Sequence, residues 1–160
     1  MKKRTVCISG GFDPLHVGHL RMIRAAKSIA GAGGKLVVIL NSDEWLTRKK
    51  GYVFMPLKER KEILLGFRYV DAVSLVDDSD GTVCEALRRI YPDVFANGGD
   101  RKEGNVPEDG VCNVLHIEMV YNVGGGKIQS SSKLASMSPV VRDRGGESEW
   151  ENEGGQNYTT

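Results

Sequence analysis

Short β-branched runs alternate with longer segments of helical spacing over the first two thirds of this 160-residue sequence. Thr5–Ile8 and Leu36–Leu40 have the character of strands, and Val17–Ala30 between them carries apolar residues at helical spacing. Leu36–Leu40 is apolar at every position, which is typical of a central parallel strand covered on both faces. The alternation predicts an α/β fold: a Rossmann-like parallel sheet of about five strands with helices on both faces.

The later segments continue this order. We expect a polar loop from Asn41 to Met55, followed by a helix that begins at Pro56 and ends near Phe67. The remaining elements are expected as strands at 72–76 and 93–96, a helix capped by Asp80 that runs to about residue 90, and a half-exposed edge strand at 115–119.

Composition places the chain among ordinary globular proteins. Hydrophobic residues make up 40% and charged residues 27%, which excludes whole-chain disorder and coiled-coil arrays. The longest apolar stretch, Leu36–Leu40, is far shorter than the roughly 20 residues of a membrane span, so we expect no membrane partner. The 22 basic and 21 acidic side chains leave a net charge of +1, which argues against a dedicated nucleic-acid binder.

The cysteines and the N-terminal residues predict a compartment. Cys7, Cys84 and Cys112 are odd in number and widely spaced, which fits neither a disulfide framework nor a zinc site. The charged first residues run into a strand rather than into a secretory apolar region, so we expect no signal peptide. Both observations predict a cytoplasmic protein in a reducing environment.

The composition changes near Pro139. From there to Thr160, two arginines stand against five acids, with Gly-rich breaks and almost no apolar periodicity. We therefore interpret residues 1–138 as one domain and residues 139–160 as a flexible acidic tail.

The most informative segment is Gly10–His19, which reads Gly-Gly-Phe-Asp-Pro-Leu-His-Val-Gly-His. It joins the first predicted strand to a helix start, where parallel sheets bind ligands and free N–H groups meet phosphates. His16 and His19 direct both imidazoles to one side, with Gly18 leaving room between them. Two such donors suit the negative charge that builds on a phosphorus under in-line attack. Metal ligation is a weak alternative function for the two histidines, because no third ligand lies nearby. The alternative without function is a tight glycine turn that carries two incidental histidines.

Three other segments suit a nucleotide. Arg48–Lys50 places three cations at the same edge of the sheet, where β- and γ-phosphates need neutralising, although a solvated charge run has the same composition. Ser130–Ser132 offers three hydroxyls at a predicted helix start, a ready site for a phosphate oxygen. In Gly98–Asp100, the acid follows a short strand and is placed to accept hydrogen bonds from ribose hydroxyls.

The histidine segment resembles the HxGH signature of the nucleotidyltransferase superfamily. The chain is most similar to heptose-phosphate adenylyltransferase and glycerol-3-phosphate cytidylyltransferase domains, from about Arg4 to Met137. Asn97 and Arg101 stand where heptose-phosphate enzymes usually carry lysine and tyrosine, so the nucleotide base and the acceptor stay open. Further landmarks of the resemblance are Asn41–Asp43, Pro56–Arg60, Val70–Val73 and Pro92–Asp93.

The resemblance implies an enzyme that transfers a nucleoside monophosphate from a nucleoside triphosphate, ATP before CTP, to a small phosphorylated acceptor such as a sugar phosphate. Pyrophosphate leaves with Mg2+. One alternative is a CTP-dependent enzyme acting on glycerol 3-phosphate or a similar polyol phosphate, and another is a nucleotide-binding module without turnover. The resemblance also implies a homodimer. The apolar run Tyr52–Met55 suits a dimer interface, an acceptor pocket or the monomer core.

The same resemblance assigns roles to residues. His16 and His19 would hold the α-phosphate and the bridging oxygen, while Lys49 or Lys50 steadies the leaving pyrophosphate together with Ser131. The nucleotide-binding residues are expected to be Gly10, Gly11, Phe12, Gly18, Gly99, Asp100, Ser130 and Ser132. The acceptor-binding residues are expected to be Asp13, Arg60 and Arg101.

Overall fold

A computed structural model describes residues 2–99 and 101–137 of the chain. The residues of the expected tail, 139–160, and Asp100 lie outside this part. In the part described, no helix combines the length and the apolar character that crossing a membrane requires. The elements in chain order are β1 (Thr5–Gly10), α1 (Val17–Ala30), β2 (Lys35–Leu40), α2 (Asp43–Lys50), α3 (Leu57–Leu65), β3 (Ala72–Leu75), α4 (Cys84–Ile90), β4 (Val94–Ala96), α5 (Asp109–Val114), β5 (Glu118–Val120) and α6 (Ser131–Met137).

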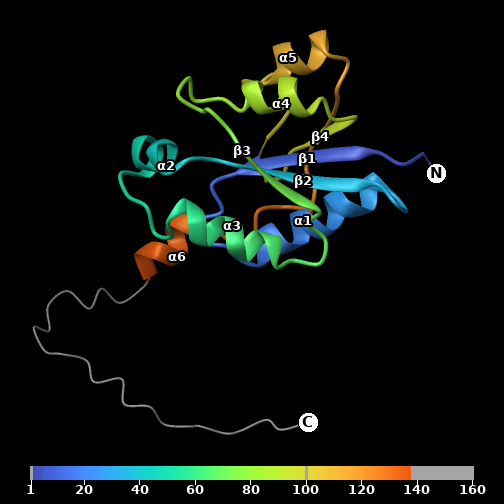
Figure 1. Cartoon of the computed structure of the whole chain (residues 1–160). Coiled ribbons are helices and arrows are strands. Elements are labelled where there is room, and N and C mark those ends of the chain that lie inside the picture. Colours follow the sequence, from blue (N-terminus) through green and yellow to red (C-terminus); the bar gives the residue numbers. More distant parts are fainter. Residues whose placement is uncertain (1, 100, 138–160) are drawn as a thin grey trace, which may run out of the picture.

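The five strands form one parallel sheet in the order β3-β2-β1-β4-β5, which confirms the predicted Rossmann-like α/β fold. From β1 the chain adds β2 and β3 on one side and then returns to add β4 and β5 on the other. The carboxyl ends of β1 and β4 therefore flank the switch in strand order, where open parallel sheets bind ligands. α2 and α6 lie on the side away from the N-terminus (Figure 1).

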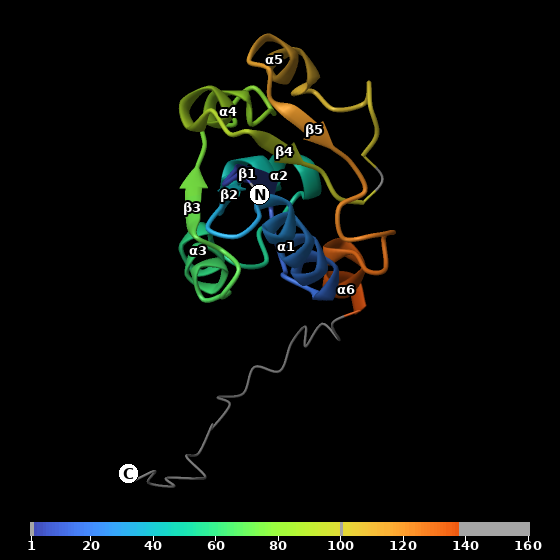
Figure 2. The same cartoon turned by 90° about the vertical axis from the view of Figure 1, so that its right-hand side faces the viewer.

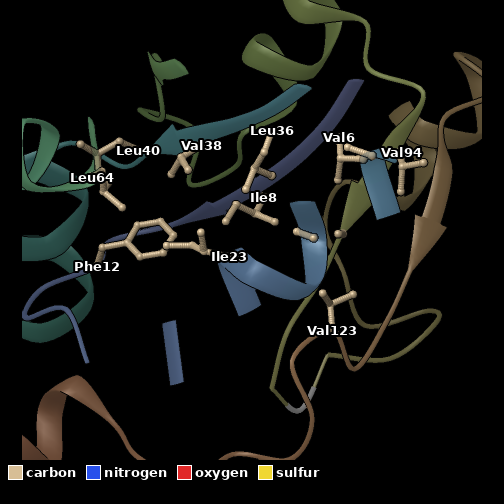
Figure 3. Packing of buried hydrophobic residues seen from close by; sticks show 13 residues of the cluster. Val6, Ile8, Phe12, Ile23, Leu36, Val38, Leu40, Leu64, Val94 and Val123 are labelled. Carbon is tan, nitrogen blue, oxygen red and sulfur yellow. The ribbon is translucent and has the colours of Figure 1, made fainter. Parts of the chain in front are cut away.

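Helices cover both faces of the sheet. α1 and α3 lie on one face, and α4 and α5 lie on the other (Figures 1 and 2). Because neighbouring residues of a strand point to opposite faces, Ile8 packs into the cluster that holds Ile23 of α1 and Leu64 of α3, whereas Cys7 joins the cluster under α4 and α5. Phe12, from the loop after β1, lies at the edge of the first cluster, between Leu64 and Ile23 (Figure 3). The core thus anchors the start of the histidine segment.

The expected polar loop from Asn41 to Met55 is wrong over α2. Ser42 caps this helix, since its Oγ accepts a hydrogen bond from the Trp45 N–H at 3.0 Å, and Gly51 ends it with φ 84°. Acids occupy the first turn and cations the last, which favours a helix through its dipole. Capping and charge rather than an apolar stripe define α2, so hydrophobic spacing did not reveal it.

Residues 80–120 differ from the expectation in detail. Val83 rather than Asp80 precedes α4, because the Asp80 carboxylate accepts hydrogen bonds from the N–H and hydroxyl of Thr82. The strand expected at 115–119 begins only at Glu118, since α5 ends just before it and the chain turns at His116 with φ 53°. β5 lies at the edge of the sheet, as predicted.

Candidate active site

A cavity of about 350 Å3 opens at the carboxyl ends of β1 and β4, the place that the strand order favours. Its wall comes from the loop after β1, the start of α1, the last turn of α2, the loop after β4 and the segment that leads into α6. Apart from Arg60 and Asp100, it brings together every residue assigned above to catalysis or binding: Gly10, Gly11, Phe12, Asp13, His16, Gly18, His19, Lys49, Lys50, Gly99, Arg101, Ser130, Ser131 and Ser132.

The two imidazoles stack on each other at the start of α1. Their ring centroids lie 3.9 Å apart with an interplanar angle of 26°. The Nδ1 atom of His16 accepts a hydrogen bond from the Gly18 N–H at 3.1 Å, and the Nδ1 atom of His19 accepts from the His16 N–H at 3.3 Å. Each imidazole therefore caps the helix through Nδ1 and retains Nε2 as its donor.

Both imidazoles are held neutral. Burial lowers the pKa of His16, and burial together with the nearby His16 and Lys50 lowers the pKa of His19 to about 3. A neutral imidazole that accepts at Nδ1 carries its proton at Nε2. The pair thus offers two uncharged N–H donors at physiological pH, not two cations.

Gly18 is required by the packing of the pair. A Cβ atom at this position would lie 2.8 Å from Cε1 and 3.0 Å from Nδ1 of His16. Any larger residue would therefore displace the His16 ring from its capping position. The space that Gly18 leaves free lies beside the His16 ring rather than between the two histidines, whose rings stack directly on each other.

The two lysines of the last turn of α2 differ in their surroundings. Lys50 Nζ donates a hydrogen bond to the Asp13 carbonyl, and burial lowers the pKa of its amine. Lys49 Nζ lies over the ring of Trp45, 4.3 Å from its centroid. Both side chains line the cavity, so the helix presents two amines in different settings to a ligand.

The structure does not place Arg60 where an acceptor can reach it, which corrects the role expected for this residue. The side chain is fully buried, and its guanidinium donates to the carbonyls of Gly11, Asn41 and Met55 at 2.7–2.9 Å and to the Asp43 carboxylate at 2.6 Å. Arg60 therefore ties together the loop after β1, the end of β2 and the segment before α3.

Asp13 is also committed to the protein. Its carboxylate is buried and accepts hydrogen bonds from the N–H groups of Phe54 and Met55 at 2.7 and 2.6 Å. These contacts join the loop after β1 to a segment 41 positions further along the chain. Among the described lining residues Asp13 is the single carboxylate, and no group of three or more described His, Cys, Asp or Glu side chains is arranged to hold a metal ion.

The serine segment lines the same cavity as the histidines. Ser131 Oγ donates to the Pro14 carbonyl at 2.8 Å and so ties the start of α6 to the histidine segment. Ser130 Oγ accepts from the Lys133 N–H at 3.0 Å and so caps the start of α6. Ser132 lines both this cavity and a second one.

The second cavity adjoins the first and has a volume of about 510 Å3. It shares Lys49, Lys50 and Ser132 with the first cavity. Tyr52 and Phe54, which are 39% and 51% exposed, add two aromatic rings to its wall. Half of the apolar run 52–55 is therefore solvent-accessible and lies next to the lysines, rather than inside the core.

Sequence reasoning missed Asp78. This buried carboxylate accepts hydrogen bonds from Asn41 Nδ2 at 3.0 Å and from the N–H and hydroxyl of Ser42 at 2.8 and 2.6 Å. Arg48 also donates to the Asp78 carbonyl at 2.7 Å. Asp78 thus holds both ends of α2, whose last turn carries the lysines. It lies in an acidic run whose neighbours are exposed, so no pattern in the sequence distinguishes it.

Known proteins resemble the chain in sequence and fold. The model of the cytidylyltransferase-like family matches residues 7–122. An FAD synthase of Thermococcus kodakarensis is 40% identical over 102 residues, which are 62% of this chain and 65% of that protein. An FAD synthase of Korarchaeum cryptofilum is 33% identical over 132 residues, or 81% of this chain and 88% of that protein. The bifunctional protein HldE of Streptomyces coelicolor is 38% identical over 110 residues, or 67% of this chain and 23% of that protein.

The match thus spans less than two thirds of the length of the Thermococcus relative. Among solved structures, a lipopolysaccharide core biosynthesis protein of Thermoplasma volcanium superposes with a TM-score of 0.61 and 24% identity, over 73% of this chain and 93% of that one. At this identity the structural likeness supports the fold alone.

Proposed function

Because the chain belongs to the cytidylyltransferase-like family, we propose that it is a nucleotidyltransferase. It transfers a nucleoside monophosphate from a nucleoside triphosphate to a small phosphorylated acceptor and releases pyrophosphate. The observation that carries this proposal is the convergence, in one cavity at the switch in strand order, of two neutral histidine donors, two lysines and the start of α6.

The chemistry asks for positioning and charge stabilisation. A phosphate oxygen of the acceptor, already ionised at neutral pH, attacks the α-phosphorus, and the bond to the bridging oxygen breaks. The Nε2–H groups of His16 and His19 donate to the α-phosphate and the bridging oxygen as charge builds there. Lys49, Lys50 and the hydroxyls of α6 meet the β- and γ-phosphates. Mg2+ enters with the triphosphate as part of the substrate.

ATP is the proposed donor. The relatives named FAD synthase form a product that contains an adenylyl group, which favours ATP over CTP for this chain. A CTP-dependent reaction on a polyol phosphate remains the alternative.

The second cavity is the proposed acceptor site. It opens beside the lysines, so an acceptor phosphate there lies near the triphosphate. Its two exposed rings, Tyr52 and Phe54, favour a planar aromatic acceptor over a sugar phosphate, because flat rings stack on aromatic side chains. FMN fits this description and agrees with the name of the FAD synthase relatives, while a heptose phosphate agrees with HldE.

A homodimer is proposed on the resemblance and on general frequency, since two-fold pairs are the commonest oligomers. If Tyr52 and Phe54 serve an acceptor, the dimer contact lies elsewhere.

The test is a matrix of donors and acceptors. ATP and CTP are each incubated with the protein and with FMN, glycerol 3-phosphate or heptose 1-phosphate, and pyrophosphate release is measured. The proposal expects release only when a donor and an acceptor are both present, fastest with ATP and FMN. Tight nucleotide binding without release in any combination would establish the non-catalytic module instead.

A further inference from the structure

Glu108 carries the one buried side-chain atom among the described residues that has no hydrogen-bond partner, its Oε2. The other carboxylate oxygen, Oε1, accepts a hydrogen bond from the Val83 N–H at 3.0 Å, at the start of α4. The side chain is only 5% exposed. A buried carboxylate oxygen without a partner is unfavourable, and such a group in a native structure calls for an explanation.

Arg101 is the cation that faces this carboxylate. Its Nη1 lies 3.7 Å from Glu108 Oε2, which is within ion-pair range and too long for a hydrogen bond. The Arg101 side chain is 39% exposed and lines the first cavity. The pair therefore spans from the interior, beside α4, to the wall of the proposed nucleotide site.

The chain between the two residues is itself fixed. Asp109 accepts hydrogen bonds from the Gly104 N–H at 2.9 Å and from the Tyr121 hydroxyl at 3.2 Å, and Val106 is buried in the core under α4 and α5. Glu108 is therefore the buried member of the pair in an anchored segment, and Arg101 is the more exposed member that lines the cavity.

We propose that Glu108 is a positioning residue that holds the Arg101 guanidinium at the wall of the first cavity, where Arg101 binds the nucleotide rather than the acceptor. The inference rests on the proposed function. It changes the role expected for Arg101, because this side chain lines the cavity of the histidines and serines and does not line the cavity of Tyr52 and Phe54. A guanidinium suits this task, since its several donors bind a carboxylate and a ligand at the same time.

The test is a double-mutant cycle on nucleotide affinity. The dissociation constant of α,β-methylene ATP, which resists cleavage at the reacting bond, is measured by calorimetry for the wild type, Glu108→Gln, Arg101→Gln and the double variant. Each single change is expected to weaken binding about tenfold, and the double variant is expected to bind no more weakly than Arg101→Gln alone. Glu85→Gln, which breaks an exposed ion pair with Arg89 on α4, is the matched control with wild-type affinity.

Each other outcome overturns the inference. Wild-type affinity in Glu108→Gln, or the same weakening by Glu108→Gln with and without Arg101, would show that Glu108 does not act through Arg101. If Arg101→Gln raises the KM for the acceptor and leaves the nucleotide affinity unchanged, Arg101 binds the acceptor instead. If Glu108→Gln does not fold, Arg101→Gln decides alone, and wild-type affinity in that variant contradicts the proposal. A wild-type protein that binds neither α,β-methylene ATP nor its CTP counterpart would instead defeat the proposed function itself.

Discussion

Each imidazole of the histidine segment has one nitrogen committed to the backbone and one left for a ligand. This division follows from the capping bonds to Nδ1 of His16 and His19, and burial keeps both rings neutral. The sequence predicted the pair and the need for Gly18. It did not predict the stacking or the capping, because these depend on how the chain turns into α1.

Removal of either histidine donor should reduce turnover and spare the fold. We expect His16→Ala or His19→Ala to lower turnover about 100-fold or more, since a donor to developing charge is lost. Steady-state pyrophosphate release measures the effect, and circular dichroism checks the fold. His116→Ala is the matched control, because His116 is exposed and lies outside both cavities. An unfolded variant, or one with wild-type turnover, would refute the catalytic assignment.

The neutral state of the histidines predicts a pH dependence of stability. The folded-state pKa of His19 lies near 3, below its usual 6.5, so the unfolded chain binds a proton that the folded protein refuses. The free energy of unfolding should therefore be level above pH 6.5 and fall as the pH drops toward 3, by at most about 1.4 kcal/mol per pH unit for this group.

Urea unfolding between pH 7.5 and 4.5 measures this slope. His19→Asn, which does not titrate, should have a shallower slope than the wild type over the same range. Asp71, whose pKa is lowered by its hydrogen bonds to Leu36 and Lys27 against the opposing effect of burial, loses its contribution only at lower pH. Equal slopes for wild type and His19→Asn would show that His19 is not held neutral.

At the scale of elements, α2 decides where the lysines stand. Its N-cap, Ser42, and its basic end are both tied to Asp78, so the helix is held at the cavity by one buried carboxylate. Hydrophobic spacing predicted α1, β2 and the edge position of β5, because those elements bury apolar residues in regular order. It missed α2, which is set by its cap and its end charges, and the six-residue α5, which has no side-chain cap.

Two adjacent aspartates provide a sharp comparison for this anchoring. Asp78→Ala should leave the Asn41 amide and the Ser42 N–H without their partner and lower the free energy of unfolding by about 2–3 kcal/mol. For a protein of this size that corresponds to a Tm lower by about 5–10 °C. Asp77→Ala should change Tm little, because Asp77 is exposed and its carboxylate accepts only from the near neighbour Ser79. Similar Tm values for both variants in differential scanning calorimetry would argue against the anchor.

Considered as a whole molecule, the protein joins two cavities through a shared wall of lysines and a serine. The fold and most of the first cavity followed from the sequence, since strand order and the carboxyl edge of a parallel sheet dictate which loops meet. The second cavity and the burial of Arg60 could not be predicted from the sequence. A buried arginine on a helix has the same sequence pattern as an exposed one, and only the tertiary contacts distinguish the two. The expected tail from Pro139 lies outside the described residues and stays an expectation.

The proposed dimer has a direct measurement. Light scattering at micromolar concentration should give about twice the chain mass of 17.5 kDa. Phe54→Asp distinguishes between a dimer interface and an acceptor site at the exposed aromatic residues. If the second cavity binds the acceptor, this variant should remain a dimer and bind the acceptor more weakly. A mass of one chain would rule out a stable dimer, and a dimer lost in Phe54→Asp would place the interface at Phe54 instead.

The central claim is that a nucleotidyl group moves from the triphosphate to an acceptor phosphate in the histidine cavity. The most direct measurement follows a label on the α-phosphorus of ATP through the reaction with FMN, in wild-type protein and in His19→Ala. The account predicts that the label appears in the acceptor adduct, that the unlabelled β- and γ-phosphates leave together as pyrophosphate, and that His19→Ala forms about 100-fold less adduct per unit time. Label recovered in ADP, with orthophosphate released, would contradict the account, because the β–γ bond would then be the one that breaks.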